Sequence, residues 1–419
     1  NRSMNDEQAT KMKILLITPR LPYPPYRGDK LKIFNLLKRL SKSNSIHLIS
    51  FVENGHEQEY IQYLAPYCAA VEVIPLPRWR SYLQCLFGLF SALPLQVHYF
   101  KSEKMRRRIA EICRRQHFDV IHTHLIRMAQ YTVGSEHPLR VLDLTDAVSL
   151  YLTRFLSREK SRLMKLLLKV ELERIKRYES LLEQFHACFV CSEPDKEQSL
   201  KAAPEANVQI IPNGVDLAYF SNDKPVPYDP ARIVFTGNLT YYPNLDGIFY
   251  FINEIFPLVK KEMPAAKFYI VGQSPPAKVR ALASNDVIVT GFVEDIKQHY
   301  LSSAVAVSPI RFGAGTLNKI LEPLALGVPV VATSMGTEGL DLTNGKEILI
   351  ADGPHTFAKH VIRVMKDQEF REKLGKEGMA LVRQLYNWDA VVQALENIYQ
   401  ELTEKNSLAR RSKQWTYIE

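Results

Sequence analysis

Short apolar runs alternate with amphipathic segments along most of the chain. Residues 12–18 and 46–52 read as buried strands, and apolar positions at helical spacing in 30–41 predict a helix between them. The same alternation restarts in the second half with strand-like runs at 233–236 and 267–271. Strands that alternate with helices are typical of βαβ units, so we expect an α/β protein with parallel sheets.

A polar, proline-rich stretch separates the two series. Residues 221–230, SNDKPVPYDP, have the composition of a linker, and 419 residues are enough for two domains. The expected division is a disordered leader at 1–11, a first domain at 12–220, a second domain at 221–388, a C-terminal helix at 389–405 and a loose tail at 406–419.

The most informative stretch lies at 304–340. An apolar run at its start predicts a buried strand, a loop from Arg311 to Gly315 follows, and Thr316 is a suitable N-cap for the next helix. Lys319 and Glu322 are three residues apart and therefore share one face of that helix near its beginning. A glycine loop, free N–H groups and cations suit an anionic ligand such as a phosphate. The alternative is an ordinary solvated Lys/Glu pair on the surface.

Polar residues also follow strands in the first half. His122 and His124 are two apart in a predicted strand, so both point to one face at its carboxyl end. Asp143 and Asp146 occur in the nearby strand-like segment VLDLTDA. Together they make a candidate acid/base or hydroxyl-binding set, and Gly28 precedes a helix in another ligand-facing loop.

The net positive charge of the chain favours an anionic partner. A formal net charge of +9 fits a nucleic acid, an acidic membrane or a phosphorylated small molecule. The segment from Trp79 to Arg108 is aromatic and apolar and ends in a basic cluster, which suits a membrane surface or, alternatively, a packed pair of helices. A second basic run at 154–177 predicts one long helix whose apolar stripe packs on a neighbour. Few aromatic residues interrupt that run, so we expect no nucleic acid partner.

The motifs in order resemble a known family. FDVIHTH, IIPNGVD, IVFTGNLTYYPNLDG, VTGFVEDI and SPIRFGAGTLNKILEPLALGVPVVAT resemble the large family of retaining glycosyltransferases numbered four, and more narrowly sugar transferases of bacterial exopolysaccharide gene clusters. The resemblance implies the GT-B fold, in which two Rossmann-like domains with parallel sheets face each other across a cleft. It also implies that the second domain holds a nucleotide-sugar, the first holds the acceptor, and the terminal helix returns to the first domain.

Roles for individual residues follow from the same resemblance. Glu322 would bind the ribose hydroxyls of the donor, and Lys319 and Arg311 would lie beside its diphosphate. His124, or alternatively His122, would contact the sugar at the reaction centre, with Asp143 and Asp146 on the acceptor side. The remaining donor-binding residues implied by the family are Gly28, Gly237, Asn238, Gly291, Phe292, Val293, Gly315 and Thr316. The chain departs from the family at Ala314, where many relatives have a glutamate, and at Asn238, where an arginine is frequent.

The expected activity is transfer of a sugar, with retention, to a lipid-linked or polysaccharide acceptor. No D-x-D motif occurs, so we expect no metal and no cofactor, with a UDP-sugar favoured over a GDP-sugar as donor substrate. The expected location is cytoplasmic, with peripheral attachment to the inner face of the cell membrane. Two alternatives stay open: a non-catalytic nucleotide-sugar-binding or scaffolding protein, and a nucleotide-sugar epimerase.

Overall fold

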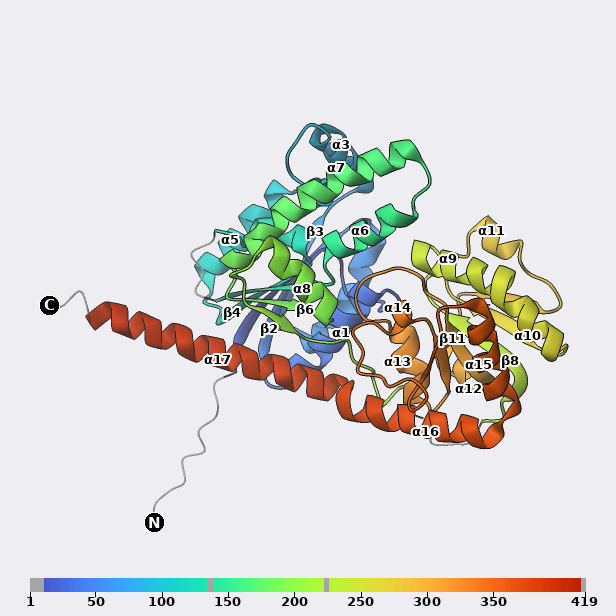
Figure 1. The fold of residues 1–419 in the computed structure, drawn as a ribbon. Helices are drawn as coiled ribbons and strands as arrows, with labels where there is room; N and C mark the ends of the chain where they lie inside the picture. Colours follow the sequence, from blue (N-terminus) through green and yellow to red (C-terminus); the bar gives the residue numbers. More distant parts are fainter. Residues whose placement is uncertain (1–10, 135–138, 222–225, 416–419) are drawn as a thin grey trace, which may run out of the picture.

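The computed structural model describes residues 11–134, 139–221 and 226–415. They form two α/β domains, each built on a sheet of parallel strands (Figure 1). The first sheet has the order β3-β2-β1-β4-β5-β6-β7 and the second the order β10-β9-β8-β11-β12-β13. The predicted fold class is therefore confirmed.

The first sheet is covered on both faces. Ile14 and Leu16 of β1 pack into one apolar cluster, and Leu15 and Ile17 of the same strand pack into another. Such a strand is a continuous apolar run because both of its faces are buried. The strands are β1 (Lys13–Thr18), β2 (Ser45–Val52), β3 (Ala70–Pro75), β4 (Val120–His124), β5 (Arg140–Thr145), β6 (Ala187–Val190) and β7 (Val208–Ile210). The helices are α1 (Gly28–Leu40), α2 (Ile61–Leu64), α3 (Arg78–Gly88), α4 (Leu95–Tyr99), α5 (Glu103–Arg115), α6 (Val148–Arg158), α7 (Arg162–Glu179) and α8 (Glu193–Ala202).

The second domain repeats this architecture with a buried core of its own. Its strands are β8 (Asp229–Thr236), β9 (Lys267–Val271), β10 (Val287–Gly291), β11 (Ser303–Ser308), β12 (Val330–Ala332) and β13 (Leu349–Ile350). Its helices are α9 (Tyr242–Tyr250), α10 (Phe256–Glu262), α11 (Ala277–Arg280), α12 (Ile296–Leu301), α13 (Asn318–Ala325), α14 (Ser334–Thr337), α15 (Pro354–Lys366) and α16 (Gln368–Leu385).

Strand order decides where a ligand can bind. In each sheet the chain changes direction of winding between two central neighbours, β1 and β4 in the first and β8 and β11 in the second. Open α/β sheets bind ligands in the crevice outside the carboxyl ends of the strands at such a switch point. His124 ends β4, Gly237 follows β8, and the loop 309–317 follows β11, so topology brings all three to ligand-facing positions.

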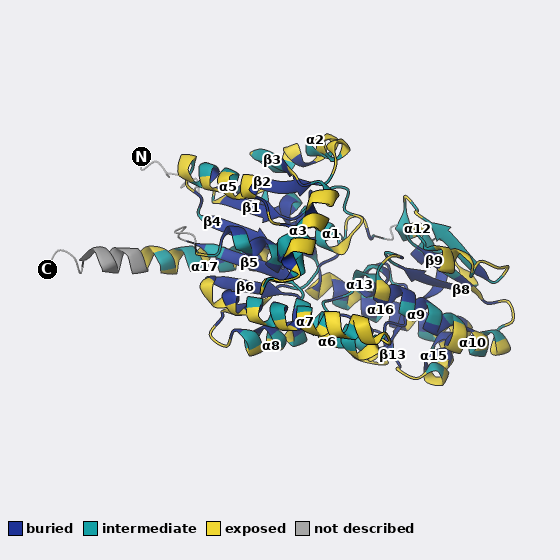
Figure 2. Ribbon diagram, turned by 90° about the horizontal axis from the view of Figure 1, so that it is seen from above, coloured by how far each residue is buried: buried dark blue, intermediate teal, exposed yellow. Residues whose placement is uncertain are grey.

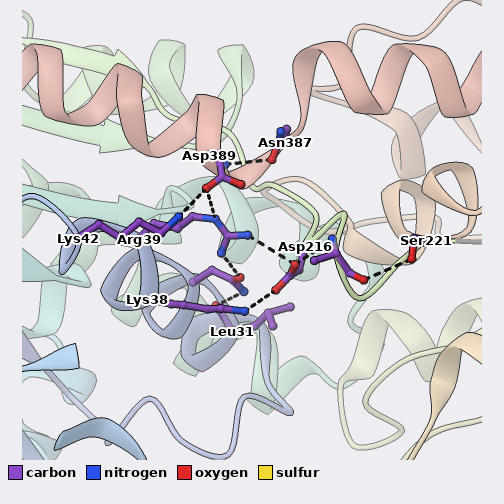
Figure 3. A network of polar contacts seen from close by, with 10 residues as sticks. Leu31, Lys38, Arg39, Lys42, Asp216, Ser221, Asn387 and Asp389 are labelled. Atoms are coloured by element: carbon purple, nitrogen blue, oxygen red, sulfur yellow. Dashed lines mark hydrogen bonds and ion pairs between the residues drawn. The ribbon is translucent and has the colours of Figure 1, made fainter. Parts of the chain in front are cut away.

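The last helix, α17 (Trp388–Trp415), leaves the second domain and crosses the first (Figure 1). Its Trp388, Leu395 and Tyr399 are buried in the core of the first domain. Figure 3 shows the ion pairs that fix the crossing: the Arg39 guanidinium contacts Asp389 at 3.2 Å and Asp216 at 3.6 Å. The loose tail predicted from residue 406 is wrong as far as Trp415, because the helix continues, and residues 416–419 lie outside the described residues.

The basic run at 154–177 is two helices and not the single one predicted. Helix α6 ends at Arg158 and α7 begins at Arg162. The Glu159 carboxylate accepts the backbone N–H groups of Lys160 and Ser161, and the Ser161 hydroxyl caps α7 by accepting the N–H of Met164. These local bonds satisfy the donors that a continuous helix would have used, so the chain turns here.

Candidate active site

The loop 309–317 connects the buried strand β11 to helix α13. Gly315 has φ of +74°, a conformation that side chains other than glycine rarely adopt. The helix begins at Asn318 with Leu317 at the N-cap, so the prediction that Thr316 caps it is wrong. The Thr316 carbonyl instead accepts a bond of 3.3 Å from the Asn213 side chain of the first domain.

Lys319 and Glu322 lie on one face of α13, as their spacing predicted, but each has its own partner. The Lys319 ammonium donates to the Asn244 side chain and lies 4.5 Å from the centre of the Phe235 ring. The Glu322 carboxylate accepts from the Tyr300 hydroxyl at 2.9 Å. Within the described residues Lys319 forms no ion pair.

Burial shifts the pKa of both groups toward neutrality. It lowers the pKa of Lys319 to about 7, against the opposing attraction of Glu322. It raises the pKa of Glu322 to about 7, against the opposing effects of the Tyr300 hydrogen bond and Lys319. Two titratable groups poised near neutral pH at the carboxyl edge of a parallel sheet are a functional-site signal.

Two further polar groups at the start of α13 are buried without a hydrogen-bond partner in the part of the chain that the structure describes. They are the Thr316 hydroxyl and the Asn318 side-chain carbonyl. Buried polar groups are normally satisfied, because leaving one unpaired costs about 1–3 kcal/mol. Their position beside Lys319 indicates a polar ligand.

Arg311 does not lie free beside Lys319. Its guanidinium forms a two-pronged contact with the Asp246 carboxylate of α9, at 2.7 and 2.8 Å, and stacks over the Tyr250 ring. The charge that the sequence assigned to a diphosphate is thus already partnered within the second domain, and its role there stays a prediction.

The turn after β8 brings Gly237 against the same helix. A Cβ atom at Gly237 would lie 2.7 Å from the Asn244 side-chain nitrogen and 3.1 Å from the Lys319 ammonium, so glycine allows this approach. The Asn238 side chain is used locally, because it accepts the backbone N–H and the hydroxyl of Thr240.

The predicted base-binding segment faces the first domain. Gly291 has φ of +74°, Val293 packs on the apolar core, and the exposed Phe292 ring meets the Tyr26 ring of the first domain at 5.1 Å. Tyr26 lies two residues before Gly28, which begins α1. The structure therefore brings the segment 291–293 close to Gly28 across the interdomain boundary.

The first domain contributes a buried charged cluster centred on Asp143. The Lys32 ammonium lies 2.9 Å from its carboxylate, and His122 and His124 approach it at 3.8 and 3.7 Å. Burial alone would raise the pKa of Asp143, but Lys32 and the two histidines outweigh it and hold that pKa well below its usual range. Asp143 is therefore ionised, and both histidine rings lie beside its carboxylate.

The two histidines differ in their free nitrogens. His122 is bonded through Nδ1 to the Tyr399 hydroxyl of α17, whereas both ring nitrogens of His124 lack a hydrogen-bond partner within the described residues. Burial lowers the pKa of His124, which leaves the ring neutral, with one donor and one acceptor. Across the described parts of the chain, no group of three or more His, Cys, Asp or Glu side chains is placed to hold a metal ion.

Asp146 joins the two halves of the candidate site. A Cβ atom at Gly315 would lie 3.4 Å from the Asp146 side chain, so the α13 loop of the second domain directly faces this carboxyl. Burial, and then repulsion from Asp195, raise the pKa of Asp146 to about 7. A carboxyl with that pKa can take up or release a proton at neutral pH.

Two residues at this site were missed from the sequence. Arg127 follows His124 on the turn after β4, its Nε is buried without a partner among the described residues, and burial lowers its pKa to about 10. Lys32 lies one helical turn after Gly28. The available signal was a basic residue three or four positions after each predicted site residue, Arg127 after His124 and Lys32 after Gly28.

Helix α6 holds the domains together beside this site. The Arg154 guanidinium contacts both carboxylate oxygens of Glu338, at 2.5 and 2.8 Å, and donates to the Gly313 carbonyl at 2.7 Å. The Phe155 ring stacks on Phe312 of the α13 loop at 6.1 Å. A small cavity in the second domain is lined by Ala314, Gly315 and Glu338 among others.

Solved structures of similar shape identify the fold. TarM aligns with a TM-score of 0.67 at 12% sequence identity, over 94% of this chain and 99% of its own. Anabaena HepE in complex with UDP-glucose aligns with a TM-score of 0.65 at 16% identity, over 93% of this chain and 100% of its own. The fold is GT-B.

Sequence comparison agrees with this GT-B fold. Residues 230–367 match the family described as Glycosyl transferases group 1. An uncharacterized 44.6 kDa protein of the cps region of Klebsiella pneumoniae is 24% identical over 396 residues, 90% of this chain and 96% of that protein. An uncharacterized glycosyltransferase of Methanocaldococcus jannaschii is 28% identical over 246 residues, 52% of this chain and 61% of its own. These matches support a GT-B glycosyltransferase.

Proposed function

We propose that the protein is a retaining, metal-independent glycosyltransferase that moves a sugar from a UDP-sugar to a lipid-linked or polysaccharide acceptor in exopolysaccharide synthesis, at the inner face of the cell membrane. The observation that carries the proposal is the buried start of α13. Within the described residues the Thr316 hydroxyl and the Asn318 side-chain carbonyl lack partners there, Lys319 and Glu322 both have a pKa of about 7, and the adjoining Gly315 lies against Asp146 of the first domain. The donor class is supported by the UDP and UDP-glucose complexes of HepE.

In this proposal the second domain binds the donor. The Lys319 ammonium and the N–H groups at 315–316 stabilise the charge that develops on the departing diphosphate, with Arg311 available if its pairing with Asp246 opens. The Glu322 carboxylate accepts hydrogen bonds from the ribose hydroxyls of the donor, and the segment 291–293 lies against the nucleotide base.

The first domain presents the acceptor. The unpartnered ring of His124 hydrogen-bonds the transferred sugar, and Asp143 with Lys32 keeps that ring in place. The acceptor hydroxyl attacks the anomeric carbon from the face that the diphosphate leaves, and its proton passes to the departing phosphate oxygen. The bond from the anomeric carbon to the phosphate oxygen breaks as the new glycosidic bond forms, which retains the configuration.

Thermal unfolding with UDP, GDP and ADP tests the donor class. A nucleotide at 100 times its dissociation constant adds about 2.7 kcal/mol, which raises the unfolding temperature by roughly 5–10 °C for a domain of this size. We expect the shift with UDP for the wild type and for Lys359→Ala, an exposed lysine on α15, and its loss in Lys319→Ala and Glu322→Ala. No shift with any nucleotide would contradict the proposal.

Product analysis tests the reaction itself. With labelled UDP-sugars we expect transfer, or slow donor hydrolysis without acceptor, and an axial or equatorial linkage that matches the donor. Lys319→Ala should reduce kcat by about 10²–10³-fold, the effect of losing one preorganised charge at a leaving group. Wild-type transfer by Lys319→Ala would refute the assigned site, donor binding without transfer or hydrolysis would indicate a scaffold, and an altered sugar without acceptor would indicate an epimerase.

A further inference from the structure

A continuous apolar surface lies on the first domain, away from the candidate active site. Helix α3 and the segment after it leave large side chains in solvent, with the Phe90 ring 97% exposed and Phe87 79% exposed. The N-terminal half of α7 does the same, with Leu163 69% exposed. The members of this apolar face are Trp79, Tyr82, Leu83, Leu86, Phe87, Leu89, Phe90, Leu93, Leu163, Met164, Leu166, Leu167 and Val170.

The two elements are bound side by side. The Arg174 guanidinium of α7 donates to the Leu89 carbonyl at 2.5 Å, and the Glu171 carboxylate accepts the Leu95 N–H at 2.7 Å. Figure 1 shows α3 beside α7, and Figure 2 shows exposed residues along both. The apolar stripe of α7 was predicted to pack on a neighbour, and this is wrong because its N-terminal half faces solvent.

A patch of this size needs an occupant, because soluble proteins rarely expose so many contiguous apolar side chains. Its surroundings are cationic. Lys160, Arg162, Lys165 and Lys169 occur on and just before the exposed half of α7, and no acidic residue lies between 160 and 170. Among residues 11–134, 139–221 and 226–415, none of these four forms an ion pair with a carboxylate.

This charge pattern favours an acidic lipid surface over a second copy of the chain as the partner of the apolar face. In a symmetric contact with a second copy, the same patch would face itself and the unpaired cations would meet each other. An acidic lipid surface instead offers acyl chains to the aromatic rings and phosphate charge to the lysines. In the described part of the chain no helix is both long and apolar enough to cross a bilayer.

We propose that α3, the segment 89–94 and the N-terminal half of α7 dock the first domain on an acidic membrane. Phe87 and Phe90 enter the interface, and Lys165 and Lys169 contact the headgroups. The consequence for a lipid-linked acceptor rests on the proposed function: the acceptor-binding domain is then held at the surface where such an acceptor resides. The docking itself needs no donor and no catalysis.

Sedimentation of the full-length protein with phosphatidylcholine vesicles, with and without phosphatidylglycerol, tests the docking. We expect tighter binding to the acidic vesicles, weakened by salt. Phe87→Ser with Phe90→Ser should lower binding to acidic vesicles more than about tenfold. Lys165→Gln with Lys169→Gln should lower it about 10–30-fold, while the matched control Lys373→Gln with Lys376→Gln on α16 should leave it unchanged.

Tryptophan emission gives a second readout. Trp79 is 66% exposed on the apolar face, whereas Trp388 is buried. In a Trp415→Phe background, contact with acidic vesicles should therefore shift the emission to shorter wavelength, and Trp79→Phe should remove that shift. The UDP-induced thermal shift should be the same in all these variants, which shows that they are folded.

The outcomes separate the docking from the enzymatic proposal. Equal binding to neutral and acidic vesicles, or full binding by the phenylalanine variant, would overturn the docking. A dimer that the phenylalanine variant abolishes, without vesicle binding, would assign the face to a second copy. Sugar transfer to a soluble acceptor without vesicle binding refutes only the docking, and vesicle binding without any transfer refutes only the proposed function.

Discussion

Donor binding should be linked to the protonation of two residues of α13 in opposite directions. In the free protein the pKa values of Lys319 and Glu322 are both about 7. A bound diphosphate favours the charged ammonium and raises the pKa of Lys319. Ribose hydroxyls that donate to the carboxylate favour its charged form and lower the pKa of Glu322. The complex therefore contains both charges, whereas the free site contains each only part of the time.

The signs give a bell-shaped dependence of affinity on pH. The contribution of Lys319 is present below its free pKa and is lost as the pH rises above 7. The contribution of Glu322 is present above its free pKa and is lost as the pH falls below 7. With both values at 7, the affinity for a UDP-sugar should fall about threefold at pH 6 and pH 8, and about 25-fold at pH 5 and pH 9.

Proton exchange provides the sharper measurement. At pH 8 the Lys319 amine takes up about 0.9 proton and Glu322 releases about 0.1, so binding takes up about 0.8 proton. At pH 6 the balance reverses, and binding releases about 0.8 proton. Isothermal titration calorimetry with UDP-glucose in buffers of different ionisation enthalpy measures this number, and the phosphates of UDP-glucose do not titrate in this range.

Variants of Glu322 and Lys319 separate the loss of affinity above pH 7 from the loss below pH 7. Both variants should bind the donor more weakly than the wild type at every pH. In the binding that remains, Glu322→Gln should take up protons and lose further affinity above pH 7, and Lys319→Met should release protons and lose further affinity below pH 7. Proton exchange near zero from pH 6 to pH 8 in the wild type would refute the assignment of donor charge to this pair.

Three further outcomes follow from contacts elsewhere in the structure. Lys32→Met should lower the free energy of unfolding in urea by about 3–5 kcal/mol, because it leaves the buried Asp143 carboxylate without its cation; a loss no greater than that of the double variant with Asp143→Leu would contradict this. Arg154→Ala should increase the radius of gyration in small-angle X-ray scattering, since its bonds to Glu338 join the domains, and an unchanged profile would show that the aromatic contacts of α6 suffice. Gly237→Ala should weaken UDP binding by about tenfold, because its Cβ would displace the Asn244 amide that holds Lys319 and would crowd the Lys319 ammonium itself, and calorimetry with unchanged affinity would refute that crowding.

The fold could be predicted from local sequence patterns, because its strands are short apolar runs with both faces buried. The strand, loop and helix at 303–325 were predictable from residues within a few positions of each other, and topology then placed them at a carboxyl edge. The placement of Lys319 and Glu322 on one face required only the period of a helix.

Partners distant in sequence were not predictable in the same way. Arg311 pairs with Asp246, 65 residues earlier, and Lys319 is bonded to Asn244, 75 residues earlier. Neither spacing leaves a mark in the sequence. The apolar stripe of α7 fails for another reason: periodicity shows that a face is apolar, but not whether protein or another phase covers it.

Buried charge is treated differently at two places in the protein, and the difference bears on how the site works. In the first domain Asp143 is paired with Lys32, so its ionisation is fixed across the physiological range. The pKa is near 7 at three residues of the candidate site, Lys319, Glu322 and Asp146. Burying their charged forms therefore lowers the free energy of unfolding of the protein without ligand. A ligand that supplies the complementary charge removes that cost. Nucleotide binding and local stability of the α13 loop should therefore rise together, and amide hydrogen exchange at 309–322 should slow with UDP while exchange at β4 and β5 stays unchanged.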